Sequence, residues 1–228
     1  MKVFRAKYPA TLRLLYPKRI SLVQNSKAIY LTFDDGPVPE VTPWVLEELA
    51  RFNAKASFFC IGDNVKKYPE IFRKVIKEGH CIGNHTFNHL NGWNYSTSNY
   101  IENTRQAEEI MVTSSEVNRN ENSKFSENKT PVYQLFRPPY GRIRNSQARS
   151  LKKQGYKLVM WDVISGDYDQ EFSAEKCFQN VIDNAESGST IVLHDSQKAF
   201  QNLSVILPKI LEYYKNKGLE FRSLKDAL

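Results

Sequence analysis

The chain has 228 residues, of which 41% are hydrophobic, 25% charged and 12% aromatic. This composition is typical of a globular protein of one or two domains, and it excludes a collagen-like, coiled-coil or wholly disordered chain. Three scattered cysteines, Cys60, Cys81 and Cys177, are too few for a disulfide framework and predict buried thiols in a reducing compartment.

Positive charge is concentrated at the N-terminus. Lys and Arg outnumber Asp and Glu by 32 to 25, a net charge of +7, and the first 20 residues hold six of the basic residues and no acidic one. We therefore divide the chain into a basic N-terminal arm (residues 1–27) and a nearly neutral body (residues 28–228). A second basic cluster, from Arg142 to Lys157, follows Pro139-Tyr140-Gly141. Either basic region could contact an anionic surface.

The sequence predicts no transmembrane segment, because no uncharged apolar stretch approaches about 18 residues. The N-terminus also lacks the apolar centre of a signal peptide, since Arg13 interrupts its apolar run. We expect a cytoplasmic protein that can associate peripherally with a membrane through residues 1–20. Nucleic-acid binding is not expected, because no recognised motif accompanies the charge.

Short apolar runs alternate with apolar residues at helical spacing in the first half of the chain. Strands are predicted at 28–33, 56–61 and 81–83, and helices at 42–52, 63–76 and 98–113. Thr42-Pro43 is typical of a helix start, and Asp63 can cap the second helix. Residues 114–130 contain very few apolar side chains and predict a mobile surface insertion.

The same alternation continues to the C-terminus. Strands are predicted at 135–136, 158–161, 190–193 and 219–221, and helices at 145–153, 173–185 and 202–217. About seven strands alternating with about six helices indicate an α/β protein with a parallel sheet. Both an incomplete (β/α) barrel and a doubly wound sheet fit this pattern, and in both the chemistry collects at the carboxyl ends of the strands.

Polar residues suited to chemistry follow these strand ends. In chain order they are Asp34 and Asp35, His85 and His89, Arg137 to Tyr140, Asp162 and Asp167, and His194 and Asp195. Three of the four histidines therefore fall on one predicted rim.

His85 and His89 have the spacing of a metal-binding pair. On one helical or near-helical turn both imidazoles would face the same point. One carboxylate from Asp34-Asp35 would complete a two-histidine, one-carboxylate set with open positions for water or substrate. Since adjacent side chains on a strand point in opposite directions, one acid can bind metal while its neighbour faces the substrate.

Two further rim residues have the chemistry of supporting groups. Near a carboxylate, His194 could act as a protonatable acid at neutral pH. Arg137 precedes two prolines, which hold it stiffly, and it could orient a carboxylate.

Together these residues resemble the polysaccharide deacetylases of the NodB-homology type, from about Ala28 to the C-terminus. The motifs occur in family order: Thr32-Phe33-Asp34-Asp35-Gly36-Pro37, His85-Thr86-Phe87-Asn88-His89, Arg137-Pro138-Pro139-Tyr140-Gly141, Trp161 to Tyr168, and Ile191-Val192-Leu193-His194-Asp195. The resemblance implies a distorted, incomplete (β/α) barrel and a divalent metal ion, usually zinc. It also implies hydrolysis of the N-acetyl group of an amino sugar.

The resemblance further implies a role for each site residue. It implies Asp35, His85 and His89 as metal ligands, Asp34 as general base, Arg137 as its partner, His194 as general acid and the Tyr140 N–H as oxyanion donor. Leu193 is expected to line the slot for the acetyl methyl group.

The fourth motif departs from the family pattern. The family commonly has Asp-x-x-Asp-Trp there, whereas this chain has Ile164 for the first acid, keeps Asp167 and has Tyr168 for Trp. We assign Asp167 as the residue that orients His194, with Asp162 as the alternative. The divergence affects the expected polymer-binding groove more than the chemistry.

Three functions are compared on this basis. The favoured one is a metal-dependent deacetylase of an amino sugar, such as N-acetylglucosamine in a glycan or its precursor. The second is a deacylase or amidohydrolase of a small acetylated or amide compound. The third is a non-catalytic binding module that uses the basic arm, and it is disfavoured because every catalytic position is filled.

Overall fold

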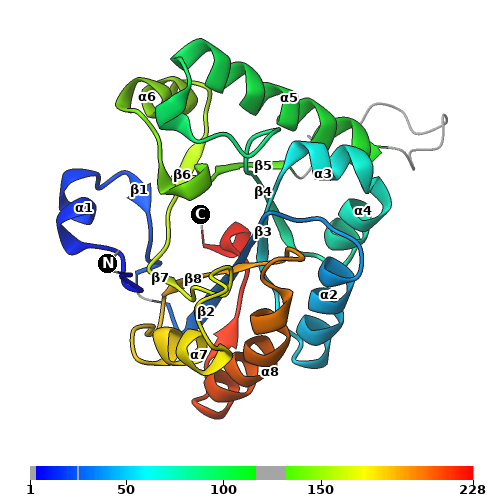
Figure 1. Ribbon diagram of the computed structural model, residues 1–228, viewed down its shortest axis with the longest axis vertical. Helices are drawn as coiled ribbons and strands as arrows, with labels where there is room; N and C mark the ends of the chain where they lie inside the picture. The colour runs from blue at the N-terminus through cyan, green and yellow to red at the C-terminus, as the bar shows by residue number, and fades with distance from the viewer. Residues whose placement is uncertain (1–3, 25, 117–131, 228) are drawn as a thin grey trace.

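A curled sheet of parallel strands forms the centre of the molecule, and helices cover its outside (Figure 1). The computed structural model describes residues 4–24, 26–116 and 132–227, which include nine strands. The strands are β1 (Arg19–Ile20), β2 (Ala28–Asp34), β3 (Ser57–Cys60), β4 (Cys81–Asn84), β5 (Val132–Phe136), β6 (Lys157–Val159), β7 (Val163–Ile164), β8 (Thr190–His194) and β9 (Glu220–Phe221).

Helices connect most of the strands. They are α1 (Ala10–Leu15), α2 (Val41–Arg51), α3 (Gly62–Lys67), α4 (Pro69–Lys77), α5 (Thr97–Glu116), α6 (Asn145–Lys153), α7 (Ala174–Ile182) and α8 (Phe200–Asn216). The short 3-10 turns η1 (Gly92–Asn94), η2 (Pro139–Gly141) and η3 (Leu224–Asp226) complete the set.

The strand order identifies a barrel that does not close completely. The order is β1-β6-β5-β4-β3-β2-β8-β7, with β9 beside β2, and the named pairs are parallel. Only residues 160–162 separate β6 from β7 in the chain, although the two strands stand toward opposite ends of this order. The sheet must therefore curl on itself, which confirms the predicted incomplete (β/α) barrel and rules out the doubly wound alternative.

The N-terminal segment fills the seam between β6 and β7. The Met160 N–H donates to the Ile20 carbonyl (2.6 Å), and the Ile164 N–H donates to the Ala6 carbonyl (2.9 Å). The Tyr8 N–H donates to the Asp162 carbonyl between them (2.8 Å). Much of the segment predicted as a basic arm thus packs on the barrel wall, where it supplies backbone hydrogen bonds that β6 and β7 do not give each other.

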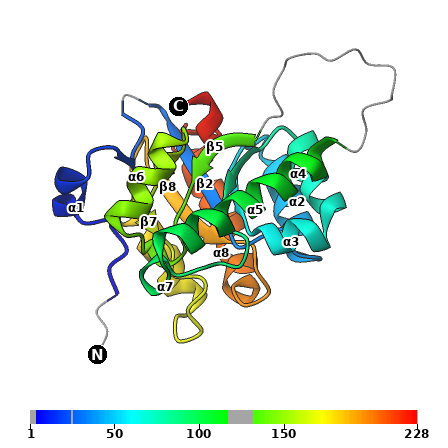
Figure 2. The same cartoon turned by 90° about the horizontal axis from the view of Figure 1, so that it is seen from above.

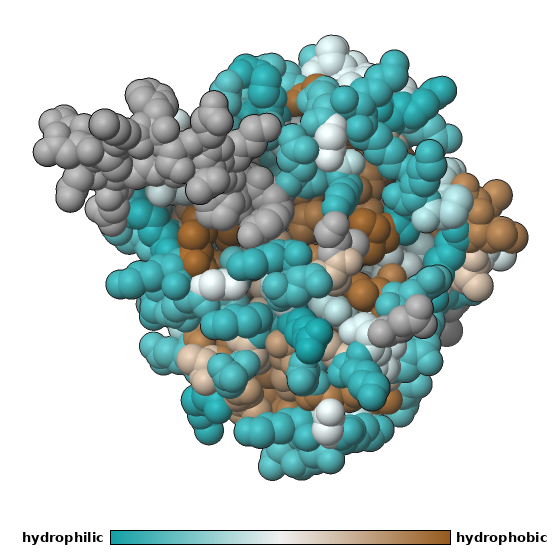
Figure 3. All heavy atoms as spheres, turned by 180° about the vertical axis from the view of Figure 1, so that it is seen from behind, coloured by the Kyte–Doolittle hydropathy of each residue, from teal (hydrophilic) through white to brown (hydrophobic). Residues whose placement is uncertain are grey.

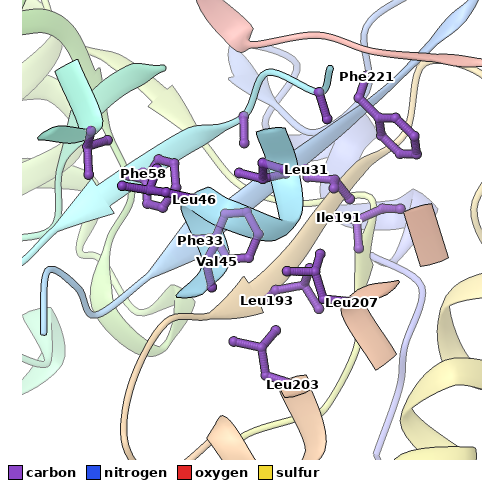
Figure 4. Close-up of a cluster of buried hydrophobic side chains, with 14 of the residues drawn as sticks. Leu31, Phe33, Val45, Leu46, Phe58, Ile191, Leu193, Leu203, Leu207 and Phe221 are labelled. Atoms are coloured by element: carbon purple, nitrogen blue, oxygen red, sulfur yellow. The ribbon is translucent and has the colours of Figure 1, made fainter. Parts of the chain in front are cut away.

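The core lies between the strands and the helices that cover them. All residues of β2 are buried, as expected for a parallel strand covered on both faces. Figure 4 shows Phe33 of β2 and Leu193 of β8 in one apolar cluster with Val45 of α2 and with Leu203 and Leu207 of α8. This packing fixes the strands whose carboxyl ends carry the polar motifs.

The structure corrects two expectations about the predicted helix at 63–76, and most of the predicted insertion at 114–130 lies outside the described residues. The single helix predicted at 63–76 is two helices, because α3 ends before Tyr68 and Pro69 starts α4 in a position that needs no N–H donor. Asp63 lies in the first turn of α3 and is not its N-cap residue. Of the predicted insertion at 114–130, residues 114–116 end α5 and residues 117–130 lie outside the described residues.

Helix α1 lies on the side of the barrel away from α2, α3 and α4 (Figure 2). Its Leu14 and Leu15 are 83% and 68% exposed. Figure 3 shows an isolated hydrophobic protrusion at the edge of the molecule where α1 lies. Among the described residues, no helix has both the length and the apolar composition needed to cross a membrane.

Candidate metal centre and active site

The predicted site residues meet at the carboxyl ends of neighbouring strands. Asp34 ends β2 and His194 ends β8, and the two residues are paired in register. His85 directly follows β4, and Arg137 directly follows β5. Parallel strands bring these positions to one edge of the barrel, although they lie far apart in the sequence.

Asp35, His85 and His89 form a compact group of potential metal ligands. Asp35 Oδ1 lies 3.3 Å from His89 Nε2 and 3.7 Å from His85 Nε2. The candidate ligand atoms of the three residues all lie within 4.8 Å of one another. Nitrogen and carboxylate ligands at such separations can share one divalent cation and leave a coordination position open.

The backbone that carries these ligands is irregular. Thr86 and His89 have positive φ angles of 66° and 54°, so the two histidines do not share the helical turn that their spacing suggested. Asp35 also has a positive φ, of 81°. These three non-glycine residues in a sparsely populated region indicate local strain in two loops, one after β2 and one after β4, that the surrounding structure holds in place.

Two observations show that the group fits a metal ion. Asp35 Oδ1 is buried and has no hydrogen-bond partner among the described residues. His85 Nδ1–H donates to the Arg137 carbonyl (2.7 Å), which leaves Nε2 with its lone pair toward Asp35. Burial lowers the pKa of His85 to about 4, so the imidazole is neutral and able to coordinate a cation.

Asp34 forms a buried ion pair with Arg137. The Arg137 Nη1 donates to Asp34 Oδ1 (2.6 Å) and to Thr32 Oγ1 (2.7 Å), and Nη2 donates to the Met160 carbonyl (2.7 Å). The guanidinium also lies 4.1 Å from the centre of the Phe59 ring. Burial alone would raise the pKa of Asp34, but Arg137, His85 and His194 outweigh it and hold that pKa below its usual value.

His194 is bound to Asp167 rather than to Asp162. Its Nδ1 donates to Asp167 Oδ1 and its backbone N–H donates to Asp167 Oδ2, both at 2.8 Å. Burial alone would lower the pKa of His194, but the ion pair with Asp167 raises it to about 9. The alternative residue, Asp162, is paired with Lys7 and Arg13 of the N-terminal segment.

Tyr140 lies beside the candidate metal centre. Its φ of 59° gives η2 an irregular turn, and its side chain is 62% exposed. The ring centre lies 4.6 Å from that of His89. The backbone of Tyr140 is thus brought to the edge of the site by the turn that follows Arg137.

Leu193 does not line the site, and its sequence-based assignment is corrected. The side chain is fully buried in the core beside α8, as Figure 4 shows. Successive side chains of a strand point to opposite faces, so Leu193 points away from the face that His194 uses.

Two supporting residues were missed by the sequence reasoning. Thr42 lies in the first turn of α2 rather than capping it, and its hydroxyl donates to Asp195 Oδ2 (2.6 Å) while Asp195 Oδ1 accepts from the Gly36 N–H (3.1 Å). Asn64 donates to the Asp35 carbonyl (2.7 Å). These bonds hold the loop that carries Asp35. The one sequence signal for them is that Asp195 directly follows His194.

Comparison with known proteins identifies the family. The family model described as polysaccharide deacetylase matches residues 22–159. A peptidoglycan-N-acetylglucosamine deacetylase of Bacillus cereus is 36% identical over 205 residues, which are 90% of this chain and 89% of the relative. The chain belongs to the polysaccharide deacetylase family.

Other polysaccharide deacetylases are similarly close. A chitooligosaccharide deacetylase of Azorhizobium caulinodans is 36% identical, with 76% of each chain covered. A crystal structure of a peptidoglycan N-acetylglucosamine deacetylase bound to an N-hydroxybenzamide superimposes with a TM-score of 0.81, 32% identity and 92% of each chain covered. These matches confirm the predicted family and its hydrolase class.

Proposed function

We infer that this polysaccharide deacetylase removes N-acetyl groups from amino sugars of a glycan or glycan precursor and releases acetate. The observation that carries the inference is the meeting of three groups at one barrel edge. These are the Asp35, His85 and His89 ligand set, the Asp34–Arg137 pair and the Asp167–His194 pair. Two of the similar proteins act, by their names, on N-acetylglucosamine in peptidoglycan and on chitooligosaccharides.

A divalent cation held by Asp35, His85 and His89 would polarise the acetyl carbonyl and acidify water. We propose zinc as that cation, since two imidazoles and one carboxylate with an open position are typical ligands of catalytic zinc. Metal analysis of the purified protein tests this. About one zinc per chain is expected, whereas another divalent ion in its place would contradict the assignment.

Two side chains of the protein carry out the two proton transfers, one each. Asp34 stays ionised because Arg137 stabilises its charge, so it can accept the proton of the attacking water. His194 stays protonated at neutral pH because of Asp167, so it can donate a proton to the departing amine. We assign the backbone N–H of Tyr140, at the edge of the site, as a hydrogen-bond donor to the acetyl oxygen on which negative charge develops.

The direct test is release of acetate from N-acetylglucosamine oligomers, measured with and without a chelator. Activity is expected to require both the cation and Asp34. Activity that persists through chelation and Asp34→Asn would contradict the mechanism. A marked preference for small acetylated amides over every sugar tested would instead favour the small-compound deacylase.

We also propose that α1 contacts an anionic membrane surface. Lys7 and Arg13 are engaged by Asp162, whereas Leu14 and Leu15 are exposed beside Lys18 and Arg19. Apolar side chains next to cations suit an anionic lipid surface.

Sedimentation with anionic vesicles tests this proposal. Binding should fall for the double variant Leu14→Ser, Leu15→Ser. It should stay unchanged for Val205→Ser, which replaces another exposed apolar residue. Equal binding by all three proteins would contradict it.

A further inference from the structure

The two basic regions of the sequence meet on one side of the barrel. Strand β1 begins at Arg19, which lies opposite Leu158 of β6 in the parallel register. Lys152 lies in the last turn of α6, shortly before β6 begins. Figures 1 and 2 both show α1 and α6 on the side of the barrel away from α2 and α4. The topology therefore brings Lys18 and Arg19 of the N-terminal segment to Lys152 of the second basic cluster.

Lys18, Arg19 and Lys152 form a group of cations without an acidic partner. Partial burial and the like charges of Arg19 and Lys18 lower the pKa of Lys152, so the three groups lie close enough to repel one another. The Arg19 guanidinium carbon lies 3.8 Å from the centre of the Tyr16 ring, which restrains it. Within the described parts of the chain, none of the three forms an ion pair with a carboxylate. A bound anion would offset their repulsion.

The hydroxyl of Tyr8 is buried beside this group. The residue is 5% exposed, and its ring packs edge-to-face on Trp161 with 5.6 Å between the ring centres. The hydroxyl oxygen has no hydrogen-bond partner among the residues that the structure describes. Burial raises the pKa of this phenol, while the guanidiniums of Arg19 and Arg13 oppose the rise because both lie near it. A buried hydroxyl without a partner is unfavourable, and a bound acceptor would remove that cost.

Arg13 also has a buried N–H group that no described residue accepts. Its Nη2 donates to Asp162 Oδ1, whereas its Nε is buried and has no partner. Asp162 accepts further hydrogen bonds from Lys7 and Ser189, so this carboxylate is engaged on the other side of Arg13. The Nε–H of Arg13 is thus a second donor without an acceptor near the Tyr8 hydroxyl.

These groups together have the chemistry of a phosphate site. We call them the N-terminal cationic cluster, which consists of Tyr8, Arg13, Lys18, Arg19 and Lys152. A phosphoryl group has several terminal oxygens, which can accept from guanidinium, ammonium and hydroxyl donors at the same time. A dianion also balances three cations better than a single carboxylate does. Because Tyr16 restrains Arg19 and Asp162 restrains Arg13, binding would immobilise few additional groups.

We propose that the N-terminal cationic cluster binds a phosphoryl group. The Tyr8 hydroxyl and the Arg13 Nε–H donate to its oxygens, and the three cations balance its charge. The cluster shares no residue with the metal centre, so the proposal is independent of the deacetylase function. The phosphoryl group can belong to a soluble phosphate compound or to a lipid headgroup that the exposed Leu14 and Leu15 of α1 would accompany.

Calorimetric titration of the metal-loaded protein with inorganic phosphate tests the site. The variants are Arg19→Gln, Lys152→Gln and Tyr8→Phe, and the control is Arg149→Gln on the exposed face of α6. Each cluster variant should weaken phosphate binding about five- to tenfold, and the control should bind as the wild type does. Arg19→Gln should also keep the acetate release of the wild type, which separates loss of the site from loss of the fold. Undiminished binding in the cluster variants, or an equal loss in the control, would overturn the proposal.

A chelator distinguishes this site from phosphate bound at the metal centre. Phosphate on the metal would persist in Arg19→Gln and disappear on chelation, and that result would overturn the proposal. Thermal unfolding gives a readout that a purely structural Tyr8 would not give. Without phosphate, Tyr8→Phe should not lower Tm, because the lost hydroxyl has no partner. Phosphate should raise the Tm of the wild type more than that of Tyr8→Phe; equal rises would count against the proposal.

Vesicles identify the source of the phosphoryl group. Phosphatidic acid exposes a phosphate monoester, whereas phosphatidylserine does not, and each is mixed with phosphatidylcholine to the same total charge. Preference for phosphatidic acid that disappears in Arg19→Gln assigns the site to a lipid headgroup. Equal binding to both vesicles, together with tighter binding of inorganic phosphate by the wild type than by Arg19→Gln, assigns it to a soluble phosphate compound. The double variant Leu14→Ser, Leu15→Ser should weaken vesicle binding and leave the affinity for inorganic phosphate unchanged.

Discussion

The Asp34 carboxylate and the Arg137 guanidinium form an ion pair that is almost completely closed to solvent, with 2.6 Å between Oδ1 and Nη1. One carboxylate oxygen is thereby engaged in holding the group ionised. The other oxygen takes no part in this ion pair among the described residues, and it is available to accept a proton at the barrel edge. This division explains how a buried acid can serve as a base at neutral pH.

Replacing Asp34 by Asn should abolish catalysis without loss of metal. The amide keeps nearly the same shape but cannot accept a proton from water, so acetate release should fall by about 10²- to 10⁴-fold. The metal content of the variant should equal that of the wild type, because Asp34 is not among the three clustered ligands. A variant that is inactive and metal-free would instead place Asp34 among the ligands.

Changing Asp35 to Asn or His89 to Ala should release the metal and abolish activity together. Each change removes one of three donors whose ligand atoms lie within 4.8 Å of one another. Metal analysis after gel filtration and acetate release after re-addition of zinc provide the check. His80→Ala is a suitable control, since His80 lies outside this cluster and should retain full metal content. Undiminished metal content in the Asp35 variant would be evidence against the site.

Activity should decline as pH rises through about 9. Asp167 holds the raised pKa of His194, so the protonated acid is present at neutral pH and is lost as pH rises through that value. Asp167→Asn removes the negative charge beside His194, while His194 stays buried. Because burial lowers the pKa of His194, the decline in activity should move to lower pH. The pH profile of kcat for wild type and variant provides the measurement. An unchanged alkaline limb in the Asp167 variant would assign that limb to another group.

The pairing of Asp162 with the N-terminal segment should give an asymmetric effect on stability. Asp162 is fully buried, whereas the Lys7 and Arg13 side chains are 33% and 30% exposed. The double variant Lys7→Met, Arg13→Met leaves the buried Asp162 charge without a cation, with the Ser189 hydroxyl still donating to it, and should lower the free energy of unfolding by about 3–5 kcal/mol. Asp162→Asn should cost less, because both cations can reach water.

Urea denaturation of the same three proteins measures this difference. Arg105→Met serves as a control, since among the described residues Arg105 forms ion pairs with exposed Glu102 and Glu109, and its replacement should change the free energy of unfolding by less than about 1 kcal/mol. A double variant as stable as the control would show that the ion pairs of Asp162 with the N-terminal segment do not stabilise the barrel.

The strands that carry the chemistry were predictable because each is a short apolar run followed at once by polar motif residues. Asp34, His85, Arg137 and His194 could therefore be placed on one rim before any coordinates were known. The alternation of α and β elements likewise indicated parallel strands, and the distinction between barrel and open sheet came only with the strand order.

What escaped prediction depends on contacts between distant residues. Strands β1 and β7 have only two residues each, too few to show a period, and β1 is defined by its pairing with β6. The Thr42–Asp195 bond joins positions 153 residues apart, and nothing near Thr42 distinguishes it from an ordinary helix start. Leu193 was misplaced because its adjacency to His194 was given more weight than the alternation of side chains along a strand.

Arg137 contributes its side chain to Asp34 and its carbonyl oxygen to His85. One residue therefore anchors both the proposed proton acceptor and a proposed metal ligand, and hydrogen bonds to Thr32, Asp34 and the Met160 carbonyl hold its buried guanidinium in place. Loops around the rim can then diverge to suit new glycans while the reaction centre keeps its dimensions.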